Sequence, residues 1–213
     1  MISAVVLAAG KSARMGQTKL LLPVLGRPMV RVVGENALRS QSHEVIFVVG
    51  HDANRVGQAI TACGEGVGAA LARKLKVVEN PDFSEGQSTS VRTGLSAVDP
   101  RSCGALMLQG DQPFVETGLI DALIRAFEAG RALVALPEYP GGGTGTPVLF
   151  SRRLFPELLA VTGDKGGREI VKNCLAGAYG DGAVARVRVL SALAGLDIDT
   201  MEEYNALAEK QEE

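Results

Sequence analysis

The most constraining feature of this sequence is the repeated alternation of short apolar runs with longer amphipathic stretches. Short apolar runs bounded by turn residues predict buried β-strands. We expect strands over residues 3–8, 44–49, 75–78, 105–108, 132–136 and 184–189, and a further strand-like run over 148–150. A chain that alternates strand and helix in this way predicts a mostly parallel sheet with helices on both faces.

The amphipathic stretches carry their own start signals for helices. Pro28 suits the first position of a helix. Asp52 is placed to cap a second helix, and Glu116 or Thr117 opens a third with an apolar stripe over 119–127. These signals fall between the expected strands, so they support the alternating order.

The C-terminal region and the domain organisation follow from the same pattern. Thr200 and Glu203 stand at capping-box spacing, which predicts the start of a last helix. No internal repeat or linker interrupts the 213 residues, a length sufficient for one large core. We therefore expect a single domain over 1–208, followed by a frayed tail over 209–213.

Charge and composition limit what such a domain binds. The 22 Lys and Arg against 24 Asp and Glu give a formal charge of −2, and aromatic residues make up 4% of the chain. Binders of nucleic acid or anionic membranes need a basic excess or patch, and the apolar runs are too short to cross a bilayer. The three separated cysteines have no metal-type spacing, and the first residues lack a basic signal start. We expect a cytoplasmic protein that binds neither nucleic acid nor membrane.

The turn after the first expected strand has the composition of an anion site. In parallel sheets, ligands bind at the carboxyl ends of the strands. Residues 7–19 read Leu-Ala-Ala-Gly-Lys-Ser-Ala-Arg-Met-Gly-Gln-Thr-Lys, so small residues free the backbone N–H groups to face an anion while Arg14 and Lys19 add positive charge. The glycine spacing matches neither a P-loop nor a dinucleotide-binding turn. A solvated surface loop is the alternative interpretation.

Acidic residues stand in two later segments. Asp111 stands in Gly-Asp-Gln-Pro just after the strand expected over 105–108, where a carboxylate can hold Mg²⁺ against phosphate oxygens. A turn cap is its simpler role. Asp197 and Asp199 are two residues apart, so they point to the same side if this segment is extended. Asp199 also suits a helix N-terminus.

In their order along the chain, these segments resemble the nucleotidyltransferase family that includes molybdenum cofactor cytidylyl- and guanylyltransferases. Residues 7–19 match every fixed position of the family motif L-A-[AG]-G-x-[SG]-x-R-[MF]-G-x-x-K. Ala9 stands where guanylyltransferases usually carry Gly, which favours the cytidylyltransferase branch. The resemblance implies a Rossmann-like three-layer α/β sandwich with a mostly parallel sheet.

Three later segments extend the resemblance. Residues 85–95 are similar to the base-contacting E-G-x-S-x-S-[VL] pattern, 141–148 to the acceptor loop, and 163–168 to the G-D-x-G-[AG]-R turn of the family. Thr146 stands where molybdopterin-handling cytidylyltransferases often have His, and Met201 replaces the Pro that follows Asp-Ile-Asp-Thr. Taken alone, Ser88 or Thr89 suits a helix N-cap equally well.

The resemblance implies a role for each motif. Arg14, Lys19 and Asp111 would be catalytic, with Asp111 as the principal ligand of Mg²⁺ and Asp199 as the second. The implied nucleotide-binding residues are Leu7, Ala8, Ala9, Gly10, Lys19, Asn80, Ser88, Ser90 and Gly110. The implied acceptor-binding residues are Thr146, Pro147, Asp164, Arg168 and Asp197, the last of which alternatively only orients its neighbour.

The implied reaction joins CTP to a phosphorylated acceptor, most simply molybdopterin, and releases pyrophosphate. An acceptor phosphate is already ionised at neutral pH, so positioning and electrostatics suffice without a side-chain nucleophile. Two alternatives stay open. One is an enzyme that uses GTP or another phosphorylated acceptor, and the other is a chaperone that hands a finished cofactor to a molybdoenzyme without turnover.

Overall fold

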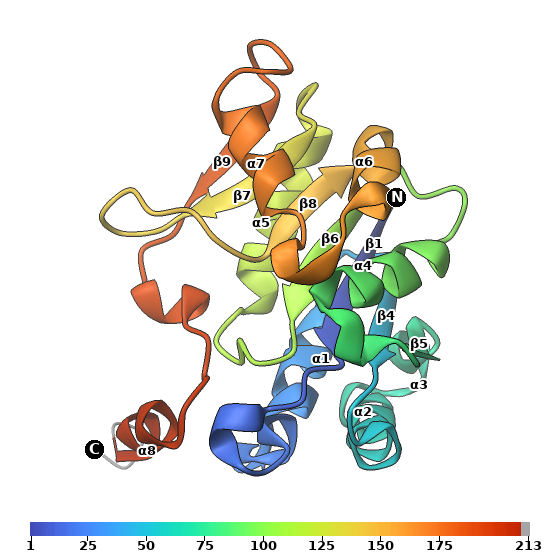
Figure 1. The fold of residues 1–213 in the computed structure, drawn as a ribbon, viewed down its shortest axis with the longest axis vertical. Helices are drawn as coiled ribbons and strands as arrows, with labels where there is room; N and C mark the ends of the chain where they lie inside the picture. The colour runs from blue at the N-terminus through green and yellow to red at the C-terminus, as the bar shows by residue number, and fades with distance from the viewer. Residues whose placement is uncertain (210–213) are drawn as a thin grey trace.

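The computed structural model describes residues 1–209, which form a central sheet between two layers of helices (Figure 1). The sheet has seven strands in the order β5-β4-β1-β6-β8-β7-β9. Their bounds are β1 Ile2–Ala8, β4 Glu44–Val49, β5 Leu75–Glu79, β6 Gly104–Gln109, β7 Val134–Glu138, β8 Val148–Ser151 and β9 Val184–Arg188. Every strand expected from the sequence is present, although β7 begins at Val134 rather than at residue 132.

The sheet is mostly parallel, as expected. Only β8 runs antiparallel, and it does so to both of its neighbours, β6 and β7. The central strands β1, β4 and β6 pair in parallel and are almost entirely buried. Because helices cover both faces, these strands need apolar residues on both sides, which explains their continuous apolar sequence.

Two hydrophobic layers lie on opposite faces of the sheet. One face packs against α1 (Met29–Arg39), α2 (Ala53–Val67) and α5 (Thr117–Glu128), and the other against α4 (Gln87–Ser96), α6 (Phe155–Ala160) and α7 (Arg168–Leu175). Successive residues of β1 alternate between them, with Val6 in the first layer and Val5 in the second. The three-layer α/β sandwich expected from the sequence is therefore confirmed.

Two predicted helix starts are wrong in detail. Pro28 is not the first helical residue but the N-cap of α1, because it pairs in a hairpin and keeps an extended ψ of 134°. Asp52 occupies the N-cap position of α2 with a φ of 53°, yet its side chain does not cap the helix. Its carboxylate instead accepts hydrogen bonds from Thr18 Oγ1 and Arg55 Nη1.

The start of α4 excludes the alternative interpretation that Ser88 or Thr89 caps the helix. The N-cap of α4 is Gly86, whose φ is 116°, and Ser88 lies inside the first turn. The other predicted starts are confirmed. The α5 helix begins at Thr117, and the capping box before α8 is formed, since Glu203 Oε2 accepts from the Thr200 amide at 2.9 Å.

The remaining elements are short. They are the hairpin of β2 (Pro23–Val24) and β3 (Arg27–Pro28), the helices α3 (Ala69–Ala72) and α8 (Met201–Glu209), and the 3-10 turns Ala13–Met15, Lys19–Leu21, Phe83–Glu85, Arg152–Leu154, Gly163–Lys165 and Ala192–Gly195. Beyond Glu209, which ends α8, the frayed tail expected over 209–213 lies outside the described residues. Among the residues described, no helix has the length and apolar character needed to span a membrane.

Candidate active site

Two cavities open beside the carboxyl ends of β1 and β6. The first, which we name the turn cavity, has a volume of about 530 Å³ and is lined by the turn after β1. The second, the wide cavity, has a volume of about 710 Å³ and extends between β8, α4, α6 and α7. The residues that line both are Leu7, Gln87, Gln109, Asp111 and Asp199. The two cavities therefore meet at a junction that carries two carboxylates.

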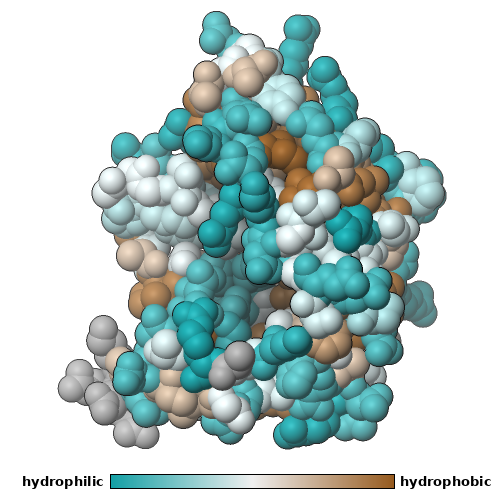
Figure 2. Space-filling model, viewed as in Figure 1, coloured by the Kyte–Doolittle hydropathy of each residue, from teal (hydrophilic) through white to brown (hydrophobic). Residues whose placement is uncertain are grey.

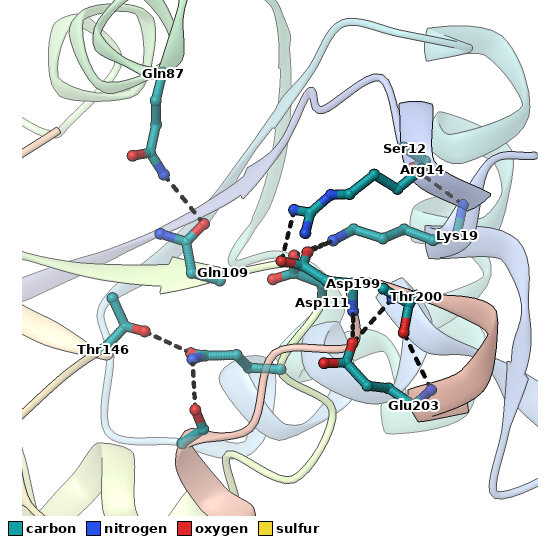
Figure 3. Close-up of polar contacts among 12 residues, drawn as sticks. Ser12, Arg14, Lys19, Gln87, Gln109, Asp111, Thr146, Asp199, Thr200 and Glu203 are labelled. Carbon is teal, nitrogen blue, oxygen red and sulfur yellow. Dashed lines mark hydrogen bonds and ion pairs between the residues drawn. The ribbon is translucent and has the colours of Figure 1, made fainter. Parts of the chain in front are cut away.

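A single lysine ammonium occupies this junction (Figure 3). Lys19 Nζ donates to Asp111 Oδ2 at 2.5 Å and to Asp199 Oδ1 at 2.8 Å. Arg14 Nη2 donates to the other oxygen of Asp199 at 2.8 Å. These contacts bring the glycine turn and the acid after β6 face to face.

The approach of the ends of β1 and β6 explains why the lysine and Asp111 meet. The Gly110 amide donates to the Leu7 carbonyl at 2.9 Å. A Cβ at Gly110 would lie 3.1 Å from that same carbonyl oxygen and 3.4 Å from the Ala8 side chain, so a larger residue would crowd the two ends and push them apart by a few tenths of an ångström. Asp111 follows directly, and the Lys19 amide is held by Ser12 Oγ at 3.2 Å.

The contacts at the junction shift the pKa values of Lys19 and Asp199 so that both side chains stay ionised. Burial alone would lower the pKa of Lys19, but the charge of Asp111 and the hydrogen bonds to both carboxylates outweigh burial and raise it above 10.5. The hydrogen bond from Lys19 is the main reason that the pKa of Asp199 lies below 3.8. Asp197 differs, because desolvation and then the charges of Asp111 and Asp199 raise its pKa.

The junction fits a magnesium ion that is also held by substrate. In the described part of the chain, no three His, Cys, Asp or Glu side chains converge on a metal position. However, Asp111 Oδ1 is buried and has no hydrogen-bond partner, and Asp199 lies across from it on the same ammonium. Mg²⁺ is usually bound by one or two carboxylates together with substrate phosphates, so this donor set suits it.

Most predicted nucleotide-binding residues surround the turn cavity. Those that line it are Leu7, Ala8, Ala9, Gly10, Lys19 and Ser90. Three others, Asn80, Ser88 and Gly110, line neither cavity. Asn80 lies beneath the loop, where its Nδ2 donates to the hydroxyls of Thr89 and Ser90 at 2.8 and 3.0 Å. Some polar side chains near the turn cavity, such as Asn80, therefore support the residues that line it rather than line it themselves.

The predicted acceptor-binding residues divide between the cavities. Thr146, Arg168 and Asp197 line the wide cavity. Asp164 instead lines the turn cavity, because its Oδ1 accepts from the Gln87 amide at 3.2 Å at the start of α4. Pro147 lines neither cavity and follows a cis peptide bond.

Several polar residues at the junction escaped the sequence analysis. Gln112 Oε1 accepts from Thr146 Oγ1 at 2.9 Å, and the Tyr139 hydroxyl donates to the Thr146 carbonyl at 2.6 Å (Figure 3 shows the first contact). Burial raises the pKa of Tyr139 to about 12, so the hydroxyl stays protonated. Gln87 Nε2 donates a hydrogen bond to Gln109 Oε1 at 3.4 Å. Their position at strand ends could have indicated these residues from the sequence, since Gln109 is the last residue of β6 and Tyr139 directly follows β7.

The wide cavity also has an extended apolar wall. Its apolar lining residues are Leu7, Val91, Met107, Val148, Phe150, Leu158, Val171 and Leu175. Figure 2 shows apolar side chains gathered in the upper part of this face, in the region of α6 and α7. One end of the cavity is therefore charged and polar, whereas the remainder can pack against a flat apolar group.

Comparisons with known proteins agree with this geometry. The family model of the MobA-like NTP transferase domain matches residues 4–181. Purine catabolism protein PucB of Bacillus subtilis is 31% identical over 207 residues, covering 94% of this chain and 93% of that protein. Molybdenum cofactor cytidylyltransferase of Escherichia coli is 29% identical over 151 residues, covering 71% of this chain and 70% of that protein.

Solved structures show the same fold. Rv0371c of Mycobacterium tuberculosis H37Rv matches with a TM-score of 0.79 and 30% identity, covering 98% of this chain and 97% of that chain. A structure of Rv0371c in complex with manganese matches with a TM-score of 0.73 and 29% identity, covering 98% of each chain. A nucleotidyl transferase from Methanothermobacter thermautotroptrophicus matches with a TM-score of 0.77 and 26% identity, covering 99% of this chain and 97% of that chain.

The family match spans most of the sheet, the glycine turn and the acid after β6. It also includes the carboxyl ends of β1 and β6, beside which the two cavities meet. The fold is that of the Rossmann-like NTP transferases, and the chemistry available at the junction is nucleotidyl transfer. The chain belongs to the MobA-like NTP transferase family and is a nucleotidyltransferase.

Proposed function

We propose that this enzyme transfers CMP from CTP to the terminal phosphate of a molybdopterin-type acceptor in the cytoplasm, with Mg²⁺ as cofactor. An acceptor phosphate oxygen forms a bond to the α-phosphorus of CTP. The bond from the α-phosphorus to the bridging oxygen of the β-phosphate breaks, and pyrophosphate leaves with that electron pair. The bridge of Lys19 between Asp111 and Asp199, where the two cavities meet, is the observation that carries this proposal.

The arrangement of the cavities suits two substrates that meet end to end. The turn cavity brings together the Gly10 turn, Arg14 and Lys19, which suit a triphosphate. The wide cavity approaches the same carboxylates from the other side and leaves room for the acceptor. Substrates in the two cavities would therefore present the α-phosphorus and the acceptor phosphate to each other at the junction.

The chain's own cations stabilise the charge that develops during transfer. Lys19 and Arg14 bind carboxylate oxygens at 2.8 Å or less, and phosphate oxygens are acceptors of the same kind. Fixed cations beside the leaving oxygens lower the barrier because they need no reorganisation. Mg²⁺ held by Asp111 and Asp199 would supply Lewis-acid neutralisation of phosphate oxygens.

Acceptor choice rests on the apolar wall and on sequence similarity. A wall that contains Met107, Val148 and Phe150 suits a flat heterocycle better than a sugar. The 29% identity to a molybdenum cofactor cytidylyltransferase supports the same choice. A different phosphorylated acceptor is the second candidate, because PucB matches this chain over a greater length.

The test of the proposed function is pyrophosphate release with Mg²⁺, CTP and molybdopterin. We expect the wild type to release pyrophosphate and Asp111→Asn to lose at least about a hundredfold in rate, since it removes a charge at the reacting phosphates. The matched control is Asp181→Asn, which changes an exposed aspartate away from the cavities and should keep the wild-type rate.

The outcomes separate the candidates. An unchanged rate in Asp111→Asn would remove this carboxylate from the mechanism. A preference for GTP over CTP would show that Ala9 is not a guide to the base. Pyrophosphate release with another phosphorylated acceptor but not with molybdopterin would favour the second candidate, and no release with any NTP and acceptor would favour a chaperone that delivers cofactor to a molybdoenzyme.

A further inference from the structure

Asp197 and Asp199 reach the site from the far end of the chain. The segment leaves β9 at one edge of the sheet, passes the 3-10 turn Ala192–Gly195, and ends in α8 (Figure 1). Tyr204 of α8 contacts the β2–β3 hairpin. Residues 196–200 belong to no helix or strand. The position of these carboxylates therefore depends on a few specific contacts rather than on the ladder of the sheet.

The residue between the two acids makes the principal contact. Ile198 is fully buried, at 0% exposure, in a small cluster with Val24 and Met29, against which Phe114 and Tyr204 pack. This cluster is separate from the two hydrophobic layers of the sheet. The Ile198 amide also donates to the Asp111 carbonyl at 3.2 Å, so it joins the two acid-bearing segments directly.

Burial of Ile198 determines where its neighbours point. Successive side chains of an extended segment alternate in direction, so a residue buried on one side sends both neighbours to the other. Both Asp197 and Asp199 line the wide cavity. Asp199 is in addition within 2.8 Å of Lys19 Nζ and of Arg14 Nη2.

Contacts made by α8, which follows Asp199 in the chain, also hold the 197–200 segment in place. Glu203 Oε2 accepts from the amides of Asp199 and Thr200 at 2.8 and 2.9 Å (Figure 3). The Tyr204 hydroxyl donates to the Pro23 carbonyl at 2.7 Å, which ties α8 to the hairpin. These contacts fix the direction of the backbone, while Ile198 supplies the buried apolar anchor.

We propose that Ile198 is a positioning residue for nucleotidyl transfer. Its docking between the hairpin and α1 places Asp199 against Lys19 and Asp111, and without it the second carboxylate leaves the junction. The part of this inference that concerns transfer rests on the proposed function. The part that concerns docking and metal affinity depends only on the geometry of the segment.

The test uses the full chain with three variants. Ile198→Ala removes the anchor, Ile198→Val keeps a shorter one, and Leu190→Ala removes aliphatic atoms from the same segment at a side chain that is 90% exposed. For each protein we measure amide hydrogen exchange, Mn²⁺ affinity by paramagnetic resonance titration, and the kcat and KM of CMP transfer.

We expect Ile198→Ala to speed exchange over 197–200 without speeding it in β1 or β6, and to weaken Mn²⁺ binding about tenfold. Its kcat should fall about tenfold or more, because small displacements of reacting groups are costly, while the KM for CTP stays within about threefold since the glycine turn is intact. Ile198→Val should restore each value to within about threefold of the wild type. Leu190→Ala should match the wild type.

Three results would overturn the proposal. Exchange over 197–200 could remain slow in Ile198→Ala, which would show that the side chain is not the anchor. Faster exchange over 197–200 together with wild-type Mn²⁺ affinity would show that the docking of Ile198 does not determine the position of the Asp199 carboxylate. Faster exchange in β1 and β6 as well would show a general loss of stability. If the wild type transfers no nucleotide, the proposed function fails while the exchange and Mn²⁺ results still decide the role of Ile198.

Discussion

At the scale of the residue, Lys19 connects the parts of the site that the sequence keeps apart. Its ammonium binds carboxylates that lie 92 and 180 positions away along the chain. The Lys19 side chain is 12% exposed, so the two negative charges are its main compensation for lost water. Without Lys19, two carboxylates would face each other across the junction.

The residue-scale prediction concerns the stability of Lys19→Met as a function of pH. The folded pKa of Asp199 lies below 3.8, so its contribution is present above pH 3.8 and is lost as pH falls through the folded value. The raised pKa of Lys19 keeps its contribution until pH rises above 10.5. We expect the variant to lose about 2 kcal/mol of unfolding free energy at pH 7, allowing for the partial exposure of Asp199.

Denaturant unfolding from pH 7 to pH 3 measures this effect. The difference between the variant and the wild type should shrink at the acid end, where Asp199 becomes protonated and no longer needs a cation. Lys165→Met, at an exposed lysine of the 163–165 turn, is the control and should differ little from the wild type. A difference independent of pH would contradict the ionic explanation.

At the scale of the element, α4 shows that polarity and ligand contact are different properties. Ser88 and Ser90 lie two residues apart in its first turns, and both are almost fully buried. Ser90 lines the turn cavity, and its Oγ accepts a hydrogen bond from Asn80 Nδ2. Ser88 Oγ has no hydrogen-bond partner among the described residues.

The element-scale prediction is that the two serines respond oppositely to alanine. Ser88→Ala should raise the unfolding free energy by about 1 kcal/mol, because it removes a buried hydroxyl without a partner. Ser90→Ala should lower it by about 1 kcal/mol, because it leaves one amide hydrogen of the buried Asn80 unsatisfied. Denaturant midpoints of the two variants measure the contrast, and a loss of stability in Ser88→Ala would refute it.

At the scale of the whole molecule, one buried glutamate joins the hairpin to the helical layer. Glu35 on α1 is 2% exposed and accepts from Arg27 at 2.5 Å, Arg31 at 2.9 Å and Arg39 at 3.2 Å. Arg27 belongs to β3, and Arg39 also donates to the Gly66 carbonyl of α2. Burial opposes ionisation of Glu35, but the three guanidinium groups outweigh it and lower its pKa below 4.5.

The prediction at this scale is that Glu35→Gln loses about 3 kcal/mol of unfolding free energy at pH 7, because three guanidinium groups lose their buried counter-charge. A depressed carboxyl pKa means that this stabilisation is present above pH 4.5 in the wild type and is lost as pH falls through the folded value. Thermal unfolding at several pH values measures it. Glu169→Gln on the exposed side of α7 is the control, and an equal loss there would refute the argument.

Local sequence patterns were sufficient for the elements of the fold. Strands buried on both faces must be apolar throughout, so β1, β4 and β6 were visible as continuous runs. The edge strands β5 and β9 are partly exposed and mix apolar with charged residues, and β8 was visible as a strand without its antiparallel direction. The capping box at Thr200 and Glu203 could also be predicted, since both partners lie three residues apart. The hairpin of β2 and β3 was missed because its strands are two residues long.

By itself, the sequence determined the alternating layers, the glycine turn, and the acids that follow the strands, because each depends on residues adjacent in the chain. Only the tertiary structure decided that Lys19 joins Asp111 to Asp199, that Asn80 and Ser88 line neither cavity, and that Asp164 lines the turn cavity. The physical reason is that these placements depend on contacts between segments far apart in sequence. The energies of such contacts are set by burial and charge in the folded molecule, which local spacing does not encode.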